Sequence, residues 1–169
     1  MRTRLNQATA PYLPPSATIL LPMSEFIDTV ARVRYAETDK MGIVYYANYF
    51  VYFEIGRVEY LRQRGLDYRQ MELEDDSFTV AAEAKCRYRR PAKFDDPLRI
   101  RTRVTSARRR TITFGYEILH DKNAELMATG ETIHVVCDSN GRPKALPEKY
   151  HQFFDYDASP STSNLKEED

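Results

Sequence analysis

The sequence predicts a single α+β domain, in which a curved antiparallel sheet of about five strands wraps around one long central helix. Stretches that alternate between apolar and polar residues are typical of strands, and the last four are joined by short connections, as in an antiparallel meander. Residues 45–64 have helical spacing instead and are apolar nearly all round in their first turns. Such a helix must be buried, and a curved sheet is the expected cover.

The domain is expected to begin with a strand over residues 26–35. Residues 1–24 hold four of the nine prolines and show no clear period, which predicts a flexible extension, with Met23 as an alternative start. Within the strand, one face is formed by Ile27, Thr29, Ala31, Val33 and Tyr35. The loop 36–42 follows and ends at Gly42, which can adopt a positive φ.

The helix over residues 45–64 has recognisable start and stop signals. Asn48 is the expected N-cap, and Gly65 is a natural stop. Polar residues return along the helix, where Glu54 and Arg57 are expected to pair on its surface. One apolar stripe is formed by Phe50, Phe53, Tyr60 and Leu61.

Four further strands and a short helix complete the domain, which spans residues 25–154. The strands are expected at residues 78–88, 98–104, 112–118 and 125–137. The pair Asn140-Gly141 marks the next turn, and residues 146–154 predict a short helix with Pro147 in its first turn. The acidic tail, residues 155–169, is expected to be disordered.

Composition excludes several classes of protein. The formal net charge is zero, which argues against nucleic acid as a partner. Cys86 and Cys137 lie in apolar runs, which predicts buried free thiols rather than a disulfide scaffold. No apolar run approaches the roughly 20 residues of a membrane span, and no secretory signal is recognisable. We therefore expect a soluble cytoplasmic protein.

Most common catalytic motifs are missing from the sequence. There is no phosphate-binding loop and no serine nucleophile elbow. His120, His134 and His151 are scattered singly without metal-ligand spacing, so we expect neither a metal nor a cofactor.

Basic residues are concentrated between Lys85 and Arg110, where eleven Lys and Arg face only two Asp. Arg99, Arg101 and Arg103 alternate along a strand and are expected to form a solvated basic face. Arg108, Arg109 and Arg110 lie instead in a turn, where guanidinium groups are free to bind phosphate. A small molecule that carries a nucleotide is therefore a candidate ligand.

Asp39 is the best candidate for a catalytic residue, because it lies just before the predicted helix. A carboxylate there can act as a base toward water or attack a carbonyl carbon. With an ordinary pKa near 3.9 it is charged at neutral pH without tuning. The N–H groups of the helix start could hold the carbonyl oxygen, which together suits acyl hydrolysis. Asp and Gly are also common turn residues, so a purely structural role stays open.

The stretch YAETDKMGIVYYANYFVYFEIGRVEYL, residues 35–61, resembles the signature of hot-dog-fold acyl-CoA thioesterases. The family is that of 4-hydroxybenzoyl-CoA thioesterase, including the branch found with Tol–Pal genes. The matching residues are Tyr35, Thr38, Asp39, Gly42, Val44, Tyr45, Tyr49, Glu54 and Arg57. RYRRPAKFDDPLRIRT also resembles the family's third-strand region, through Pro91, Asp95 and Asp96. The resemblance extends over about residues 26–154.

The resemblance implies a set of functional residues. Asp39 would be the nucleophile or general base, and the backbone N–H of Tyr46 would polarise the thioester carbonyl. Further substrate-binding positions would be Gly42, Tyr45, Arg108, Arg110 and Arg142. The three arginines would contact CoA phosphates from a neighbouring subunit, which implies a homodimer or a dimer of dimers.

Tyr46 departs from many family members, which carry His at this position. Tyrosine cannot serve as a base at neutral pH, so the catalytic work would fall to Asp39. Members that act on aromatic acyl groups carry Tyr here, and both a short-chain and an aromatic acyl group stay open.

Two rival functions deserve a test. A hydratase or dehydratase on the same fold would need a His or Glu on the central helix, where Glu54 is the only candidate. A non-catalytic acyl-CoA-binding subunit is the second rival, and the intact Asp39 argues against it.

Overall fold

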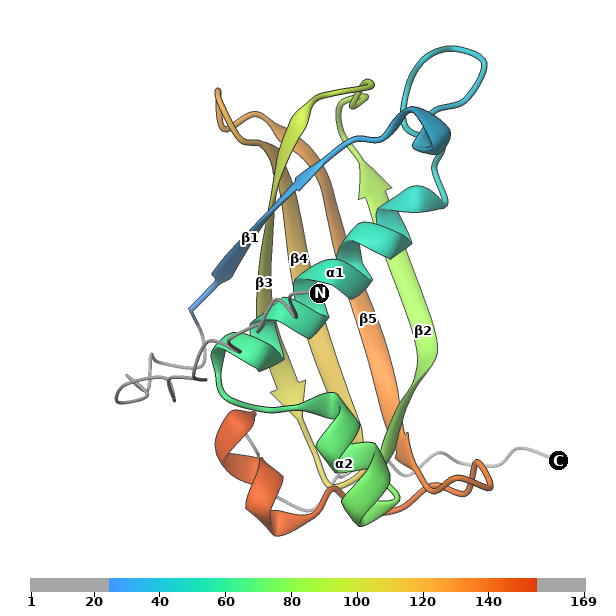
Figure 1. The fold of residues 1–169 in the computed structure, drawn as a ribbon, viewed down its shortest axis with the longest axis vertical. Coiled ribbons are helices and arrows are strands. Elements are labelled where there is room, and N and C mark those ends of the chain that lie inside the picture. The colour runs from blue at the N-terminus through green and yellow to red at the C-terminus, as the bar shows by residue number, and fades with distance from the viewer. Residues whose placement is uncertain (1–24, 155–169) are drawn as a thin grey trace, which may run out of the picture.

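Helix α1 lies across one curved, five-stranded antiparallel sheet (Figure 1). The computed structural model describes residues 25–154, so the predicted N-terminal extension and C-terminal tail lie outside the described residues. The strands are β1 (Ile27–Arg32), β2 (Phe78–Tyr88), β3 (Pro97–Ala107), β4 (Thr111–His120) and β5 (Leu126–Cys137). The helices are α1 (Asn48–Gln63), α2 (Tyr68–Asp75) and two 3₁₀ helices, η1 (Tyr35–Glu37) and η2 (Glu148–Phe153). The predicted α+β class is confirmed.

The strand order in the sheet is β1-β3-β4-β5-β2. Only β3, β4 and β5 form the predicted meander, because β2 pairs with β5 instead of β3. The expectation of four consecutive neighbours was therefore wrong for β2. The physical reason is the connection over residues 89–96, which crosses past the loop before α1. Val44 N donates to Ala92 O there at 2.8 Å, and Val33 N donates to Asp96 O at 3.1 Å.

Helix α1 buries one face rather than its whole circumference. Phe50 is half-buried and Val51 is 38% exposed, so the expected burial all round the first turns was wrong. The sheet covers only one side of the helix. The buried face follows spacings of three and four residues: Tyr49, Tyr52, Phe53, Gly56, Tyr60 and Leu61.

Close packing of α1 against the sheet depends on small residues. A Cβ atom at Gly56 would lie 2.4 Å from Thr102 Oγ1, so glycine permits the approach of α1 to β3. One turn earlier, the ring of Phe53 stacks on Tyr116 of β4 with centroids 4.5 Å apart. A Cβ at Gly130 of β5 would lie 2.2 Å from the Phe53 ring. These contacts fix the helix over the middle of the sheet.

Three local elements differ from the prediction. The first strand ends at Arg32, and Tyr35, expected on its buried face, lies in η1 and is 78% exposed. Helix α2 was not predicted; the Asp67 side chain caps it by accepting a hydrogen bond from Arg69 N. The last predicted helix is the 3₁₀ helix η2, with Pro147 at its N-cap.

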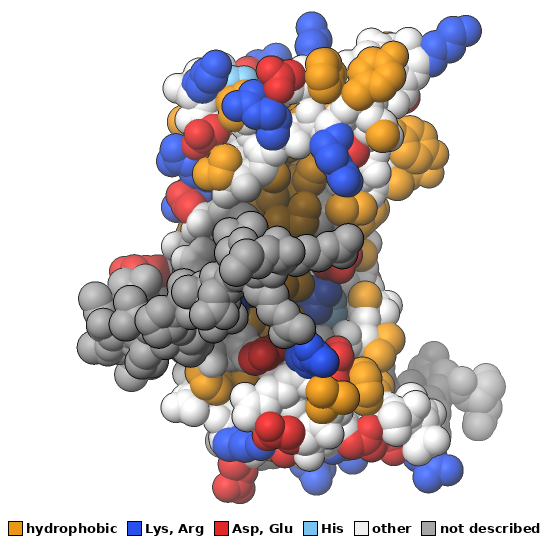
Figure 2. All heavy atoms as spheres, viewed as in Figure 1, with side chains coloured by type: hydrophobic (Ala, Val, Ile, Leu, Met, Phe, Trp, Pro, Cys, Tyr) orange, Lys and Arg blue, Asp and Glu red, His pale blue; other side chains and the backbone are white. Residues whose placement is uncertain are grey.

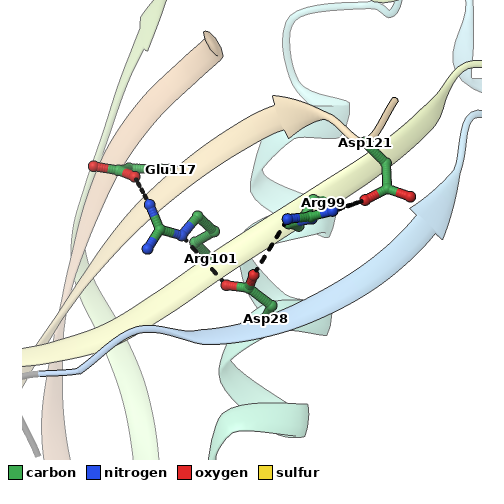
Figure 3. Close-up of polar contacts among 5 residues, drawn as sticks. All are labelled: Asp28, Arg99, Arg101, Glu117 and Asp121. Atoms are coloured by element: carbon green, nitrogen blue, oxygen red, sulfur yellow. Dashed lines mark hydrogen bonds and ion pairs between the residues drawn. The ribbon is translucent and has the colours of Figure 1, made fainter. Parts of the chain in front are cut away.

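The outer face of the sheet carries compensated charges rather than a basic stripe. Arg99 and Arg101 point away from the core as predicted, but each lies between two carboxylates (Figure 3). Arg99 pairs with Asp121 at 2.6 Å, and Arg101 with Glu117 at 2.9 Å; Asp28 pairs with both arginines. The expected solvated basic face is therefore neutralised locally, which leaves this face with little attraction for polyanions.

The two cysteines are free, as predicted: Cys137 is buried and Cys86 is half-buried. No helix within residues 25–154 is long and apolar enough to cross a membrane.

Candidate active site

A pocket of about 350 Å³ opens where the loop before α1 meets the end of β2. It brings together Asp39, Tyr45 and Tyr46, which were predicted from one stretch of sequence, with the distant segment 88–91. The lining residues are Asp39, Ile43, Val44, Tyr45, Tyr46, Tyr49, Tyr88, Arg89, Arg90 and Pro91.

The Asp39 carboxylate is held in place by one of its two oxygens. Oδ1 accepts a hydrogen bond from Met41 N at 2.7 Å, whereas Oδ2 accepts none from the part of the chain that the structure describes. Gly42 adopts φ +74° and donates its N–H to Asp39 O at 2.9 Å, which closes the turn. Gly42 thus shapes the loop and does not line the pocket. The free oxygen is the one available to water or substrate.

Helix α1 begins without a side-chain cap. Ala47 is the N-cap, with helical φ −68° and ψ −24°, so the expectation of Asn48 as the cap was wrong. The physical reason is a preceding turn, in which Asn48 N donates to Tyr45 O at 2.9 Å and makes Asn48 already helical. Among residues 25–154, the N–H groups of Tyr46 and Ala47 have no hydrogen-bond partner. Uncapped N–H groups at a helix start can bind an anionic oxygen.

Glu37 organises this loop, although sequence reasoning missed it. Its side chain is 5% exposed and accepts hydrogen bonds from Tyr52 Oη and Arg34 N, both at 2.8 Å. Its backbone oxygen accepts from Tyr45 N and from the Asn48 side chain. Burial raises the pKa of Glu37, but the hydrogen bonds from Arg34 and Tyr52 outweigh it and lower the pKa below its usual value. The ionised carboxylate therefore fixes the helix start beside Asp39.

The wall of the pocket is aromatic. Tyr49 and Tyr88 pack edge to face at 5.1 Å, and Tyr88 Oη donates to Tyr46 O at 3.1 Å. Burial, followed by the neighbouring Cys86, raises the pKa of Tyr88 to about 12, and burial also raises the pKa of Tyr49. Both phenols stay protonated at neutral pH. Among the described residues, Asp39 is also the only carboxylate that lines the pocket, which leaves it as the candidate base.

The predicted phosphate-binding arginines lie away from this pocket. Arg108 and Arg110 are in the β3–β4 turn, and Arg142 is in the turn after β5. The two turns share one end of the sheet, since Val136 N donates to Arg110 O at 2.9 Å. The pocket is at the opposite end, beside the end of β2 (Figure 1). One chain thus brings Asp39, Tyr45 and Tyr46 together, but not these arginines with them.

Two other arginines, Arg89 and Arg90, line the pocket from the connection after β2. Arg90 pairs with Glu125 at 3.2 Å, and both backbone N–H groups donate to Met127 O. The repeated basic residues of this segment signalled a cationic surface, but not its place beside Asp39. The residues that the structure describes contain no group of three or more side chains suited to hold a metal ion.

Known proteins resemble this chain in sequence and in fold. The profile of the thioesterase-like superfamily matches residues 33–154. The acyl-CoA thioester hydrolase YbgC of Escherichia coli O6:H1 is 34% identical over 118 residues, covering 69% of this chain and 87% of the relative. The acyl-CoA thioesterase YbgC of Haemophilus influenzae is 32% identical over 125 residues, covering 73% and 90%. A DHNA-CoA thioesterase from Staphylococcus aureus superposes with a TM-score of 0.72 at 28% identity, covering 76% and 87%.

Proposed function

The chain belongs to the thioesterase-like superfamily, and we propose that it hydrolyses acyl-CoA thioesters to the free acid and CoA in the Asp39 pocket. The resemblance to hot-dog acyl-CoA thioesterases is confirmed, and the sheet around α1 is the hot-dog fold. The main support for this site is the Asp39 oxygen that accepts no hydrogen bond within the described residues. It lies in a pocket that is also lined by the uncapped start of α1.

The geometry suits a direct route for hydrolysis. The thioester carbonyl oxygen accepts the N–H of Tyr46, and negative charge that develops on it is stabilised at the helix N-terminus. Asp39 Oδ2 takes a proton from water as the water oxygen attacks the carbonyl carbon. Collapse of the tetrahedral intermediate breaks the C–S bond, and the thiolate receives the proton from Asp39.

Asp39 can also attack the carbonyl itself. The carboxylate then forms a mixed anhydride with the acyl group as the thiolate leaves, and water hydrolyses the anhydride to restore Asp39. A single turnover in ¹⁸O-labelled water tests the nucleophilic route. Label in the Asp39 carboxylate indicates that route, with water attack on the Asp39 carbonyl carbon, whereas label only in the acid product fits both general base catalysis and water attack on the acyl carbon of the anhydride.

A second subunit would complete the site. Strand β2 is a long edge strand whose residues Val80 to Lys85 are exposed, and such edges are normally covered. Antiparallel pairing of β2 with the same strand of a second copy would place the Arg108 and Arg110 turn of that copy toward the Asp39 end. The exposed edge of β2, and the position of these arginines at the end of the sheet opposite their own Asp39, support the prediction that they contact CoA phosphates across a dimer. The tetrameric state and the cytoplasmic location stay predictions.

The rival functions find less support. Glu54, the one carboxylate that a hydratase could use on α1 according to the sequence, is exposed and does not line the pocket. A non-catalytic acyl-CoA-binding subunit would not need the free oxygen of Asp39.

An assay of butyryl-CoA and benzoyl-CoA hydrolysis, with release of the CoA thiol as the readout, tests the proposal. We expect Asp39→Asn to lower kcat by about a thousandfold with intact binding, in line with loss of a catalytic group. Glu54→Gln is the matched control and should retain activity. Near-normal turnover in Asp39→Asn would place the chemistry elsewhere, and binding without thiol release in the wild type would favour the non-catalytic subunit.

A further inference from the structure

Large apolar side chains are exposed together at the end of the molecule that carries Asp39. Three of them lie outside the pocket: Tyr35 is 78% exposed, Met41 is 81% exposed and Phe94 is 55% exposed. Tyr35 and Met41 precede α1, whereas Phe94 lies in the connection between β2 and β3. Single apolar residues on a surface are ordinary, but a patch of large ones commonly marks an interaction site. We call Tyr35, Met41 and Phe94 the apolar tip.

The two loops that carry the apolar tip form one surface. The rings of Tyr35 and Phe94 pack edge to face with their centroids 5.7 Å apart. Ile43 and Lys93 form an isolated antiparallel bridge, and Met41 is only two residues from Ile43. The loop before α1 projects past the end of β2 (Figure 1). The apolar tip therefore lies beyond the edge strand through which the proposed dimer would pair.

Three cations beside the apolar tip have no counter-charge. Lys40, Arg89 and Lys93 are exposed, and no carboxylate of the described residues pairs with them. Most other charges of these loops are compensated, in the pairs Arg32–Asp95, Arg34–Glu37 and Arg90–Glu125. Asp39 and Asp96 remain, and both are half-buried. Figure 2 shows basic and hydrophobic side chains together at this end of the visible face. The exposed, uncompensated charge around the apolar tip is therefore positive.

Arg57 of α1 also lacks an ion pair within the described residues, but it does not belong to this surface. The pair with Glu54 that the sequence predicts does not form. The Arg57 guanidinium donates instead to Tyr68 Oη at 2.9 Å and to Thr79 Oγ1 at 3.5 Å. These contacts lie toward the other end of the sheet, and Arg57 is half-buried among them.

This chemistry suits an anionic lipid surface better than a protein surface. Phenylalanine and methionine are apolar, and a tyrosine ring enters the region of the lipid headgroups while its hydroxyl stays in contact with water. Lysine is depleted at protein–protein interfaces, whereas each lysine or arginine near an anionic bilayer strengthens the attraction. Two copies that met tip to tip would bring the same cations together, which is unfavourable.

We propose that the apolar tip and its three cations dock the protein on a bilayer that contains anionic lipid. The apolar tip enters the headgroup region, while Lys40, Arg89 and Lys93 contact the lipid phosphates. Because Met41 and Asp39 belong to one turn, docking places the Asp39 pocket beside the lipid surface. Docking goes beyond the proposed hydrolysis and does not depend on it.

Flotation of the full chain with vesicles tests the proposal. Phosphatidylcholine vesicles are compared with vesicles that contain about one third phosphatidylglycerol, at low and at high salt. We expect the partition coefficient to be about tenfold or more higher on the anionic vesicles, and to fall at high salt. Lys40→Glu/Lys93→Glu should remove this preference, and Tyr35→Ser/Phe94→Ser should reduce binding to both kinds of vesicle.

Matched controls change the same kinds of residue at the opposite end of the sheet. Leu73→Ser replaces an apolar side chain that is 74% exposed on α2, and Arg69→Glu/Arg109→Glu reverses two exposed charges. Both should bind vesicles as the wild type does. Thermal unfolding of each variant shows that the fold is intact, and hydrolysis of butyryl-CoA in solution should be unchanged in Tyr35→Ser/Phe94→Ser.

Three outcomes overturn the inference and leave the proposed hydrolysis untouched. The wild type could partition equally on both kinds of vesicle or bind to neither. An equal loss of binding in Arg69→Glu/Arg109→Glu would show a general effect of charge rather than docking at the apolar tip. A change in oligomer mass by light scattering in Tyr35→Ser/Phe94→Ser, with unchanged vesicle binding, would assign the apolar tip to contact with a second copy.

Discussion

Tyr52 donates a buried hydrogen bond of 2.8 Å to Glu37, which joins the second turn of α1 to the segment that leads into the Asp39 loop. The same carboxylate accepts from the Arg34 backbone and guanidinium, so one side chain binds a strand end, a loop and a helix. Because these bonds hold the pKa of Glu37 low, its contribution to stability is present above the ordinary carboxyl pKa. It is lost as the pH falls through the lowered value.

Glu37→Gln should therefore impair both stability and catalysis. The amide keeps the shape but removes the charge that Arg34 and Tyr52 stabilise, and we expect kcat to fall about tenfold as the Asp39 loop loosens. Thermal unfolding and steady-state kinetics measure the two effects. Tyr52→Phe, which removes one bond only, should cause a smaller loss. Wild-type kcat in Glu37→Gln would show that the loop is held without it.

Gly56→Ala should destabilise the fold although alanine favours helices. The added Cβ would lie 2.4 Å from Thr102 Oγ1 and 2.6 Å from Ile100 Cγ2, so α1 must move away from β3. Overpacking of this kind costs about 1–3 kcal/mol, more than the gain in helix propensity of about 1 kcal/mol. Urea unfolding gives the change, with Glu54→Ala as the exposed control on the same helix. An unchanged or raised free energy of unfolding would contradict the packing argument.

The sequence was sufficient for features that depend on neighbouring residues. The alternation of apolar and polar residues predicted β2 at its observed bounds, Phe78–Tyr88. The helical spacing of apolar residues predicted α1 to within a few residues at each end. Asp39, Tyr45 and Tyr46 come from one local stretch, so their presence in one pocket was also predictable.

Features that depend on distant residues were not predictable in the same way. Alternation shows which face of β2 is apolar, but not that its neighbour is β5. Helix α2 is short and largely polar, so its period was too weak to detect. Glu37 is buried only because Arg34 and Tyr52 pair with it, and an acidic residue in a loop shows no sign of that. Arg89 and Arg90 line the pocket because the connection over residues 89–96 passes beside the loop before α1, a contact between segments far apart in the sequence.

His134 should make stability depend on pH in a defined window. Its pKa is lowered to about 4 in the fold, against about 6.5 when unfolded, so the unfolded chain binds the proton first as the pH falls. The contribution is complete above pH 6.5 and is lost toward pH 4, with a slope of up to about 1.4 kcal/mol per pH unit. Urea unfolding at pH 7, 5.5 and 4.5 measures the slope, which His134→Gln should reduce. An identical slope in that variant would assign the dependence to other groups.

The proposed dimer depends on the free edge of β2. Ala82 is skipped in the register with β5, between Ala81 opposite His134 and Glu83 opposite Ile133. Proline is tolerated at such an irregularity but cannot donate to another strand, so Ala82→Pro should leave the fold intact and yield a monomer. Light scattering after size exclusion gives the mass, with Ala82→Ser as a control that retains the N–H. A dimer in Ala82→Pro would place the interface elsewhere.

Arg108 and Arg110 are expected to bind the phosphates of CoA. Replacing both with Ala should raise KM for butyryl-CoA by about tenfold or more, because each guanidinium forms charge-assisted hydrogen bonds to phosphate. KM for the N-acetylcysteamine thioester of butyrate, which lacks the nucleotide, should change little. Arg103→Ala, an exposed arginine on β3, is the matched control. Equal effects on both substrates would count against a phosphate role.

Mixed dimers decide which subunit these arginines serve. Each chain places Arg108 and Arg110 at the end of the sheet opposite its own Asp39, so a shared site takes its arginines from the other copy. Co-expression of Asp39→Asn with the Arg108→Ala/Arg110→Ala double variant should then restore one intact site per mixed dimer. Random pairing makes half of the dimers mixed, so activity at low butyryl-CoA should recover to about a quarter of the wild-type value. If each subunit uses its own arginines, no intact site forms, and the mixture should show only the average of its two parents.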